Sequence, residues 1–140
     1  MSMKAGIWID HRKAMIVTID GGEERMTVLF SAVEKHGSRS GDSPLHGSYE
    51  ALQVSADDRR QRALTQALDV FYDAVIDAVR KGESLLICGP GEAKGELRKR
   101  LERKGLGRHI AAVETEDKMT DRQIAAKTHS YFAEAPHRAS

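Results

Sequence analysis

One stretch of the sequence carries residue types that suit phosphate binding. LLICGPGEAKGELRKRL, at 85–101, runs from an apolar segment through Gly89, Pro90 and Gly91 into a basic helical pattern. Glycines between a strand and a helix often hold a phosphate, because the helix N-terminus attracts anions. The turn does not match the P-loop, and the dinucleotide fingerprint needs a third glycine where Lys94 stands. Glu92 adds a carboxylate that competes with a phosphate, so the motif itself favours a tight turn.

Basic side chains gather on and after this helical pattern. Between residues 94 and 108 the only acids are Glu96 and Glu102. The basic residues in that stretch are Lys94, Arg98, Lys99, Arg100, Arg103, Lys104 and Arg108. Such a ridge suits contact with a phosphate backbone, and the water-facing side of an ordinary helix is the alternative reading. Aromatic residues make up only 5% of the chain, so stacking on single-stranded bases is not expected.

Asp10 ends the first apolar run, where a carboxylate can hold a catalytic metal. Two-metal hydrolysis needs several carboxylates around the ions. The apolar run at 85–88 supplies none, and Glu114 and Glu116 belong to a later run. We therefore interpret Asp10 as a turn residue that accepts backbone hydrogen bonds, and we predict neither a metal nor another cofactor.

The segment 35–54 contains hydroxyl, imidazole and carboxylate groups without a periodic pattern. These groups belong to His36, Ser38, Ser40, Asp42, Ser43 and His46. A hydrolytic triad can be drawn among them, but triad members normally stand on separate rigid elements. The two histidines have no further residues at zinc-ligand spacing. We predict a long, mobile polar loop with no catalytic residue.

The composition is typical of an ordinary intracellular domain. The 140 residues fit one domain, and 22 Lys+Arg stand against 21 Asp+Glu, so any basic surface has to be local. Cys88 is the only cysteine, which rules out an internal disulfide and favours a reducing cytosol. The sequence shows no signal peptide, and no apolar run approaches the roughly 20 residues of a membrane span. We expect a cytoplasmic protein without membrane contact.

The hydrophobic pattern divides the chain into strands and helices. Five apolar or β-branched runs predict strands at 5–10, 13–19, 26–34, 84–89 and 109–114. Helical spacing predicts helices over roughly 57–80 and 92–104, and a last helix that begins at the capping box 120–123. Ser55 is the predicted N-cap of the first of these helices.

The order βββ-αβ-αβ-α predicts an α/β fold with a mixed sheet and helices on both faces, the order of a ribonuclease-H-like fold. We expect one domain over 1–134 and a disordered tail over 135–140. Because the strand at 26–34 is expected at the edge of the sheet, it can pair with a second copy, and a homodimer is a possible assembly.

Several motifs occur in an order that resembles the central domain of Pelota and of the archaeal and eukaryotic class-one peptide release factors. GPGEAK at 89–94 opens a helix after an apolar strand, and AGIWIDHRKAMIVTI at 5–19 is similar to the family's first hairpin. KHG at 35–37 is similar to the tripeptide before the release factors' catalytic loop. A basic-then-apolar helix at 59–71 and the acidic ETE at 114–116 occupy matching places.

The chain departs from the release factors at the loop that carries their chemistry. Their loop contains Gly-Gly-Gln, whose glutamine positions water on the peptidyl-tRNA ester, whereas residues 38–43 read SRSGDS here. Pelota's central domain also lacks this tripeptide and acts by occupying the ribosome. The resemblance covers roughly residues 4–133, and it implies a non-catalytic, stand-alone bacterial-type version of the domain.

The resemblance and the basic cluster predict a non-catalytic, translation-associated factor that binds the ribosome, ribosomal RNA or tRNA. The predicted RNA contacts are Lys35, His36, Arg39, Lys94, Arg98, Lys99, Arg103, Lys104 and Arg108. The predicted loop and turn positions are Gly37, Gly41, Gly89, Pro90 and Gly91. One alternative is a hydrolase on the same fold, either a metal-dependent nuclease or an esterase of peptidyl- or aminoacyl-tRNA. Another is a small dimeric interaction protein that binds no nucleic acid.

Overall fold

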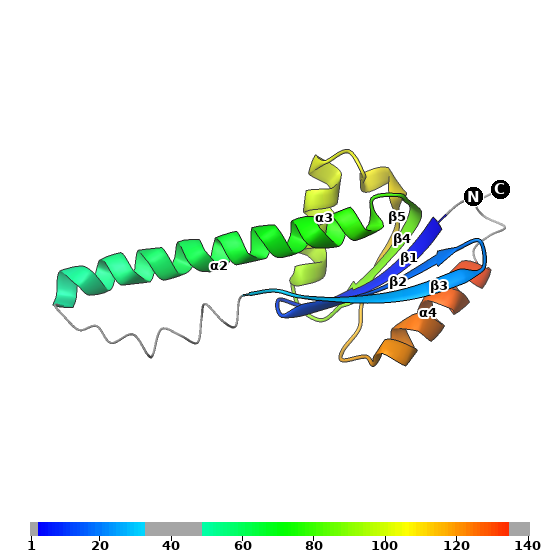
Figure 1. Ribbon diagram of the computed structural model, residues 1–140, viewed down its shortest axis with the longest axis horizontal. Coiled ribbons are helices and arrows are strands. Elements are labelled where there is room, and N and C mark those ends of the chain that lie inside the picture. The colour runs from blue at the N-terminus through cyan, green and yellow to red at the C-terminus, as the bar shows by residue number, and fades with distance from the viewer. Residues whose placement is uncertain (1–2, 33–48, 135–140) are drawn as a thin grey trace.

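A mixed sheet forms the centre of the molecule (Figure 1). The computed structural model describes residues 3–32 and 49–134. Within them the strands are β1 (Met3–Ile9), β2 (Lys13–Asp20), β3 (Glu23–Phe30), β4 (Gly82–Gly89) and β5 (Ile110–Thr115). They lie in the order β3-β2-β1-β4-β5. β1 to β3 form an antiparallel meander, while β4 is parallel to both β1 and β5.

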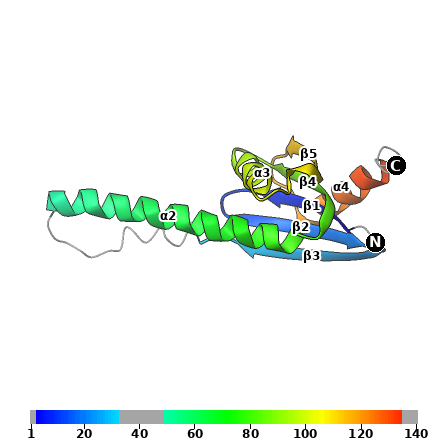
Figure 2. The ribbon, with the colours of Figure 1, turned by 90° about the horizontal axis from the view of Figure 1, so that it is seen from above.

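Helices cover both faces of this sheet. The described helices are α2 (Tyr49–Val79), α3 (Ala93–Arg103), the short 3-10 helix η2 (Gly107–His109) and α4 (Asp121–Glu134). Figure 2 shows α2 and α3 on one face and α4 on the opposite face. The predicted α/β fold class, with the order βββ-αβ-αβ-α, is therefore confirmed.

The two faces of the sheet bury separate apolar clusters, because successive strand residues point to opposite sides. Ile7 and Ile9 of β1 pack in the larger cluster with Phe71 of α2 and Leu97 of α3. Trp8 points the other way, into a smaller cluster beneath α4, and only 2% of its surface is exposed. The strand alternation thus anchors all three long helices.

The helix α2 begins earlier than predicted. It starts at Tyr49, whereas the sequence pattern placed its start near residue 57 with Ser55 as N-cap. The prediction was wrong because YEALQ at 49–53 is rich in good helix formers, and extending an existing helix costs little compared with starting one. Residues 49–54 of the predicted loop are therefore helical.

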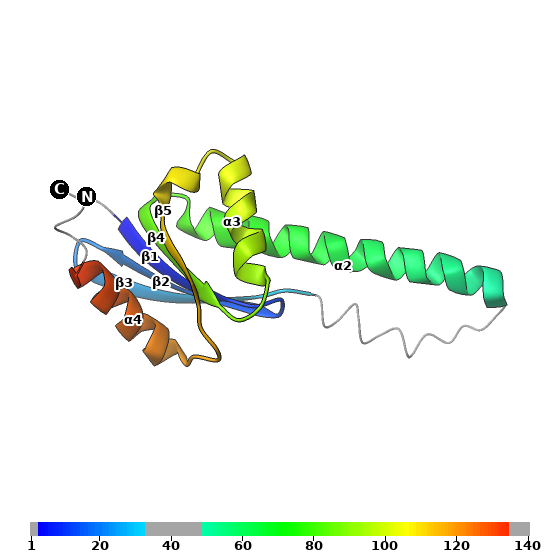
Figure 3. The ribbon, with the colours of Figure 1, turned by 180° about the vertical axis from the view of Figure 1, so that it is seen from behind.

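The remainder of the predicted loop lies outside the described residues. So do the predicted site residues Lys35, His36, Gly37, Arg39 and Gly41, and the predicted tail over 135–140. Figure 3 shows that the N-terminal half of α2 extends beyond the sheet, while its C-terminal half packs on it. None of the helices in the described ranges combines the length and apolar character needed to cross a bilayer.

Candidate nucleic-acid interface

The glycine turn joins β4 to α3 at close quarters with β1. Gly89 has a φ of 152°, and a Cβ there would lie 2.1 Å from the backbone oxygen of Ile9. Gly91 has a φ of 66°, in the left-handed region that glycine tolerates best. The carbonyl oxygen of Gly89 also accepts a hydrogen bond from the Glu116 backbone nitrogen at 3.1 Å. Close backbone packing therefore accounts for the glycine at position 89.

The start of α3 carries charges that stabilise the turn itself. Glu92 is the N-cap residue, and its side chain makes no capping hydrogen bond. The Lys94 ammonium donates a hydrogen bond of 2.5 Å to the carbonyl oxygen of Gly91. Lys94, one of the predicted RNA contacts, is therefore directed at the turn.

The other basic residues of this cluster differ in exposure, because one side of α3 packs on the sheet. Leu97 and Leu101 are buried against the sheet, so the opposite side of the helix faces water. The exposed basic residues on that side and just beyond it are Arg98, Lys99, Arg103, Lys104 and Arg108. These side chains form an exposed basic surface that we call the α3 ridge.

Two aspartates of α2 neutralise part of this cluster. Arg100 forms an ion pair with Asp69, and its second nitrogen lies 3.8 Å from a carboxylate oxygen of Asp73. The Lys104 ammonium lies 3.7 Å from the same oxygen. Sequence reasoning missed these acids because they lie on α2, which the strand β4 separates from α3 along the chain. Arg100 therefore joins two helices, and Lys104 carries a partly compensated charge.

A cavity of about 310 Å³ lies between α2 and α3. Lys99, Arg100 and Arg103 contribute positive charge to its lining, Asp69 and Glu96 contribute negative charge, and Thr65 contributes a hydroxyl. Within the described ranges Lys99 and Arg103 take part in no ion pair or hydrogen bond. These two side chains are therefore the cations of the cavity best placed to meet an anion from solvent.

A hydrogen-bonded cluster at the other side of this cavity joins three elements. One carboxylate oxygen of Glu96 accepts a 2.5 Å hydrogen bond from the Tyr72 hydroxyl and lies 3.1 Å from Nε2 of His11. The Arg100 guanidinium lies 5.2 Å from the centre of the Tyr72 ring. Burial, followed by the hydrogen bond to Glu96, raises the pKa of Tyr72 well above its usual range, so its hydroxyl stays a neutral donor. No sequence motif indicated this cluster.

The carboxylates considered for metal chemistry are engaged in protein contacts. One oxygen of Asp10 accepts hydrogen bonds from the backbone nitrogens of Arg12 at 2.8 Å and Lys13 at 2.9 Å, which confirms its predicted role in the turn. Lys127 lies 2.7 Å from Glu114 and 2.9 Å from Glu116, and these two carboxylates raise the pKa of Lys127. Within residues 3–32 and 49–134, no group of three potential ligands is placed to hold a metal ion.

Comparison with known proteins gives structural matches only. No family model matches the sequence, and a search of curated proteins found no match. The Pelota protein of Thermoplasma acidophilum superimposes with a TM-score of 0.51 at 14% identity, over 95% of this chain and 32% of that protein. An archaeal translation termination factor, aRF1, gives a TM-score of 0.46 at 14% identity, over 98% of this chain and 41% of that one.

The first of these matches establishes a shared fold. A TM-score above 0.5 over nearly the whole chain shows that the sheet and helices follow the Pelota arrangement. At 14% identity the match speaks for the fold alone. The present chain spans about a third of the length of the Pelota protein.

Proposed function

We propose that this protein is a translation-associated factor that corresponds to the central domain of Pelota and the release factors, and that it binds ribosomal RNA or tRNA through the α3 ridge. The observation that carries the proposal is the exposed pair Lys99 and Arg103, which line a cavity on a fold shared with Pelota and lack protein partners among the described residues. Unpaired cations on a rigid helix meet phosphates at little reorganisation cost.

The mechanism requires no covalent step. The phosphate oxygens of an RNA strand would accept hydrogen bonds from Lys99 and Arg103, while Arg98 and Arg108 extend the contact along the ridge. Arg100 would act as a positioning residue, because Asp69 and Asp73 hold it across the two helices. Lys35, His36 and Arg39, which lie outside the described residues, remain the proposed second contact.

The hydrolase alternative gains no support from the described carboxylates. Asp10 is occupied by two backbone donors, and Glu114 and Glu116 share Lys127. A hydrolytic site built on these three carboxylates would have to release these contacts before it could bind an ion or a water.

Sedimentation in sucrose gradients tests the proposal. We expect the protein to travel with ribosomes at low salt and to be released as salt rises, because phosphate contacts depend on counterion release. Lys99→Glu with Arg103→Glu should abolish co-sedimentation, whereas the matched pair Lys118→Glu with Arg122→Glu, on exposed positions near α4, should leave it unchanged. Absence of the wild type from ribosomal fractions at every salt concentration, or equal behaviour of both double variants, would refute the proposed contact.

A further inference from the structure

One side of the molecule exposes apolar surface that the proposed RNA contact does not use. β3 is an edge strand, and no other strand in the described ranges pairs with its outer side. The large apolar side chains with high exposure lie on β3 and on the adjoining side of α2: Val28 at 41%, Phe30 at 72% and Val70 at 69%. An unpaired edge beside exposed apolar side chains is a typical template for association.

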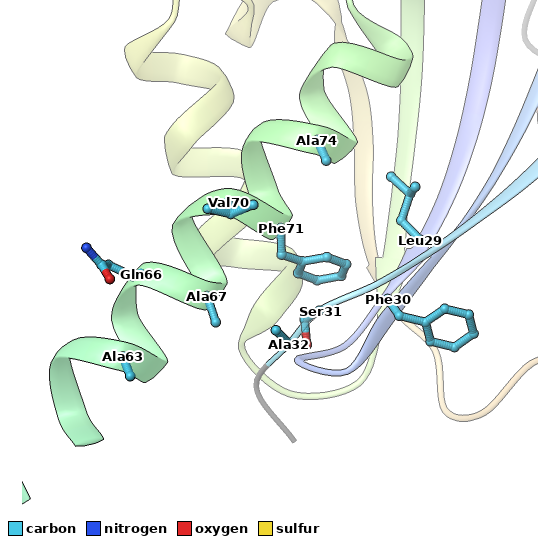
Figure 4. Close-up of a pocket in the computed structure, with 10 residues that line it drawn as sticks. All are labelled: Leu29, Phe30, Ser31, Ala32, Ala63, Gln66, Ala67, Val70, Phe71 and Ala74. Atoms are coloured by element: carbon cyan, nitrogen blue, oxygen red, sulfur yellow. The ribbon is translucent and has the colours of Figure 1, made fainter. Parts of the chain in front are cut away.

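A groove of about 360 Å³ runs between the edge strand and the helix (Figure 4). Leu29 lines it from the strand, and Ala67, Val70 and Phe71 line it from the helix. In Figure 4 the Phe71 ring points toward β3, whereas the Phe30 ring points away from α2. The apolar surface therefore continues from the helix, over the strand edge, to the other face of the sheet.

We propose that a second copy of this chain covers this groove, related by a two-fold axis that passes beside Phe30 and between Ala67 and Val70. Under this operation Phe30 faces the same residue of the second copy across an antiparallel pair of edge strands, in the kind of aromatic pairing that stabilises sheets. Val70 of each copy meets Ala67 of the other. One operation thus covers Phe30 and Val70 and brings residues 28–32 of the two copies, at the ends of their edge strands, side by side.

The charges of α2 favour an antiparallel second copy over an unrelated apolar partner. On the turns before the groove the helix carries Asp58, Arg59, Arg60 and Arg62, and after it Asp77, whereas Asp69 and Asp73 face α3. Arg60 and Asp77 each lie one heptad from the groove residues, Arg60 before Ala67 and Asp77 after Val70, so they share the groove face. An antiparallel copy places Arg60 of each chain beside Asp77 of the other, where it would add to the contacts that both residues make within their own chain, such as the 3.0 Å pair of Asp77 with Arg80. A parallel copy would bring like charges together.

The spacing of the elements is also compatible with this axis. α2 packs on both β2 and β3, so its axis lies roughly 5 Å from a two-fold axis placed half a strand spacing outside β3. The two α2 helices would then lie about 10 Å apart, which is the distance at which helices pack. The second copy can therefore pair its strand and pack its helix at the same time.

Sedimentation equilibrium of the full chain tests the proposal. We expect a mass of two chains, and we expect Val70→Glu to raise the dissociation constant of the dimer at least tenfold. The circular dichroism spectrum should be unchanged, because Val70 is exposed in the single chain and its replacement does not disturb the core. Ala111→Glu on the opposite edge strand β5, also at an exposed position, is the matched control and should leave the dimer intact. A monomer at all concentrations, or a dimer that Val70→Glu does not weaken, would overturn the proposal.

Spin labels locate the axis independently. A label on Val70→Cys should report a distance between copies below about 25 Å, since the two helices lie about 10 Å apart. A label on Ala111→Cys should report more than about 40 Å, because four strand spacings separate β5 from the edge at β3. The reverse order of distances would place the contact at β5 and overturn the proposal. Ribosome sedimentation of Val70→Glu should match that of the wild type, so failure of the dimer and failure of the RNA contact are distinguishable.

Discussion

Gly6 of β1 and Thr128 of α4 define a contact whose energy can be worked out atom by atom. An added Cβ at Gly6 would lie 1.8 Å from the Thr128 hydroxyl oxygen, 2.9 Å from its Cβ and 3.0 Å from its methyl carbon. Ordinary contact begins at 3.4 Å. Thr128 is fully buried, and its hydroxyl donates a 2.7 Å hydrogen bond to the carbonyl oxygen of Ile124. Gly6→Ala therefore forces the Thr128 side chain, and the part of α4 that carries it, to shift away from β1.

The expected destabilisation is about 2–4 kcal/mol. Moving the hydroxyl costs its hydrogen bond, about 1 kcal/mol, and overpacking of the core costs about 1–3 kcal/mol more. Thr128→Ala alone should be nearly neutral, because the gain in helix propensity offsets the lost contacts. In the double variant the new Cβ meets only one close atom. The destabilisations of the two single variants should therefore add up to about 1–2 kcal/mol more than the destabilisation of the double variant.

Urea denaturation measures this cycle, with the fluorescence of the buried Trp8 and circular dichroism as two probes of unfolding. Gly95→Ala is the control, because its added Cβ would meet no atom within 4 Å and the residue lies inside α3. That variant should gain about 0.5–1 kcal/mol. Additive effects at Gly6 and Thr128, or a Gly6→Ala protein as stable as the wild type, would refute the close packing of α4 on β1.

Three further perturbations have distinct expected outcomes. Burial raises the pKa of Cys88 to about 12. The free energy of unfolding should therefore fall by about 1.4 kcal/mol per pH unit as pH rises above the unfolded pKa of about 8.5 and toward the folded one. Urea unfolding of Cys88→Ala at several pH values should lack this fall, and the same dependence of stability on pH in both proteins would contradict the prediction. Tyr72→Phe removes the donor to Glu96 and should cost about 1–2 kcal/mol in urea unfolding; a cost near zero would show that the hydrogen bond contributes nothing. Asp73→Asn removes the carboxylate beside Lys104, so RNA filter binding should tighten and show a steeper salt dependence; unchanged binding would place Lys104 outside the RNA contact.

Most strands and the last helix were predictable because their signals are local, whereas the strand predicted at 26–34 begins and ends earlier, at Glu23–Phe30. The run predicted at 84–89 corresponds to β4 over Gly82–Gly89, and the run at 109–114 corresponds to β5 over Ile110–Thr115. The capping box at the start of α4 is confirmed, because the Gln123 backbone nitrogen donates to the Thr120 hydroxyl at 3.1 Å and the Thr120 backbone nitrogen donates to the Gln123 side chain at 2.8 Å. Each of these features depends on residues within one element or one turn.

The candidate site was less predictable because its contacts join distant parts of the chain. Basic residues on α3 were visible in the sequence, but the acids that neutralise them lie on α2, 31 residues away in the case of Arg100 and Asp69. His11 reaches Glu96 across 85 residues. Only the fold brings such residues together, so sequence reasoning located the ridge without separating its paired charges from its unpaired ones.

Different sides of the helix α2 make separate contacts. Phe71, Val75 and Val79 fill the core, and Asp69 and Asp73 face α3, where they hold Arg100. These aspartates lower the positive potential between the helices, so binding of a polyanion there depends on the cations that they leave unpaired. Val70 lies on another side of the helix, toward the groove beside β3. Because the proposed RNA contact lies on α3 and the proposed dimer contact lies on another side of α2, a change at either surface should leave the other surface in place.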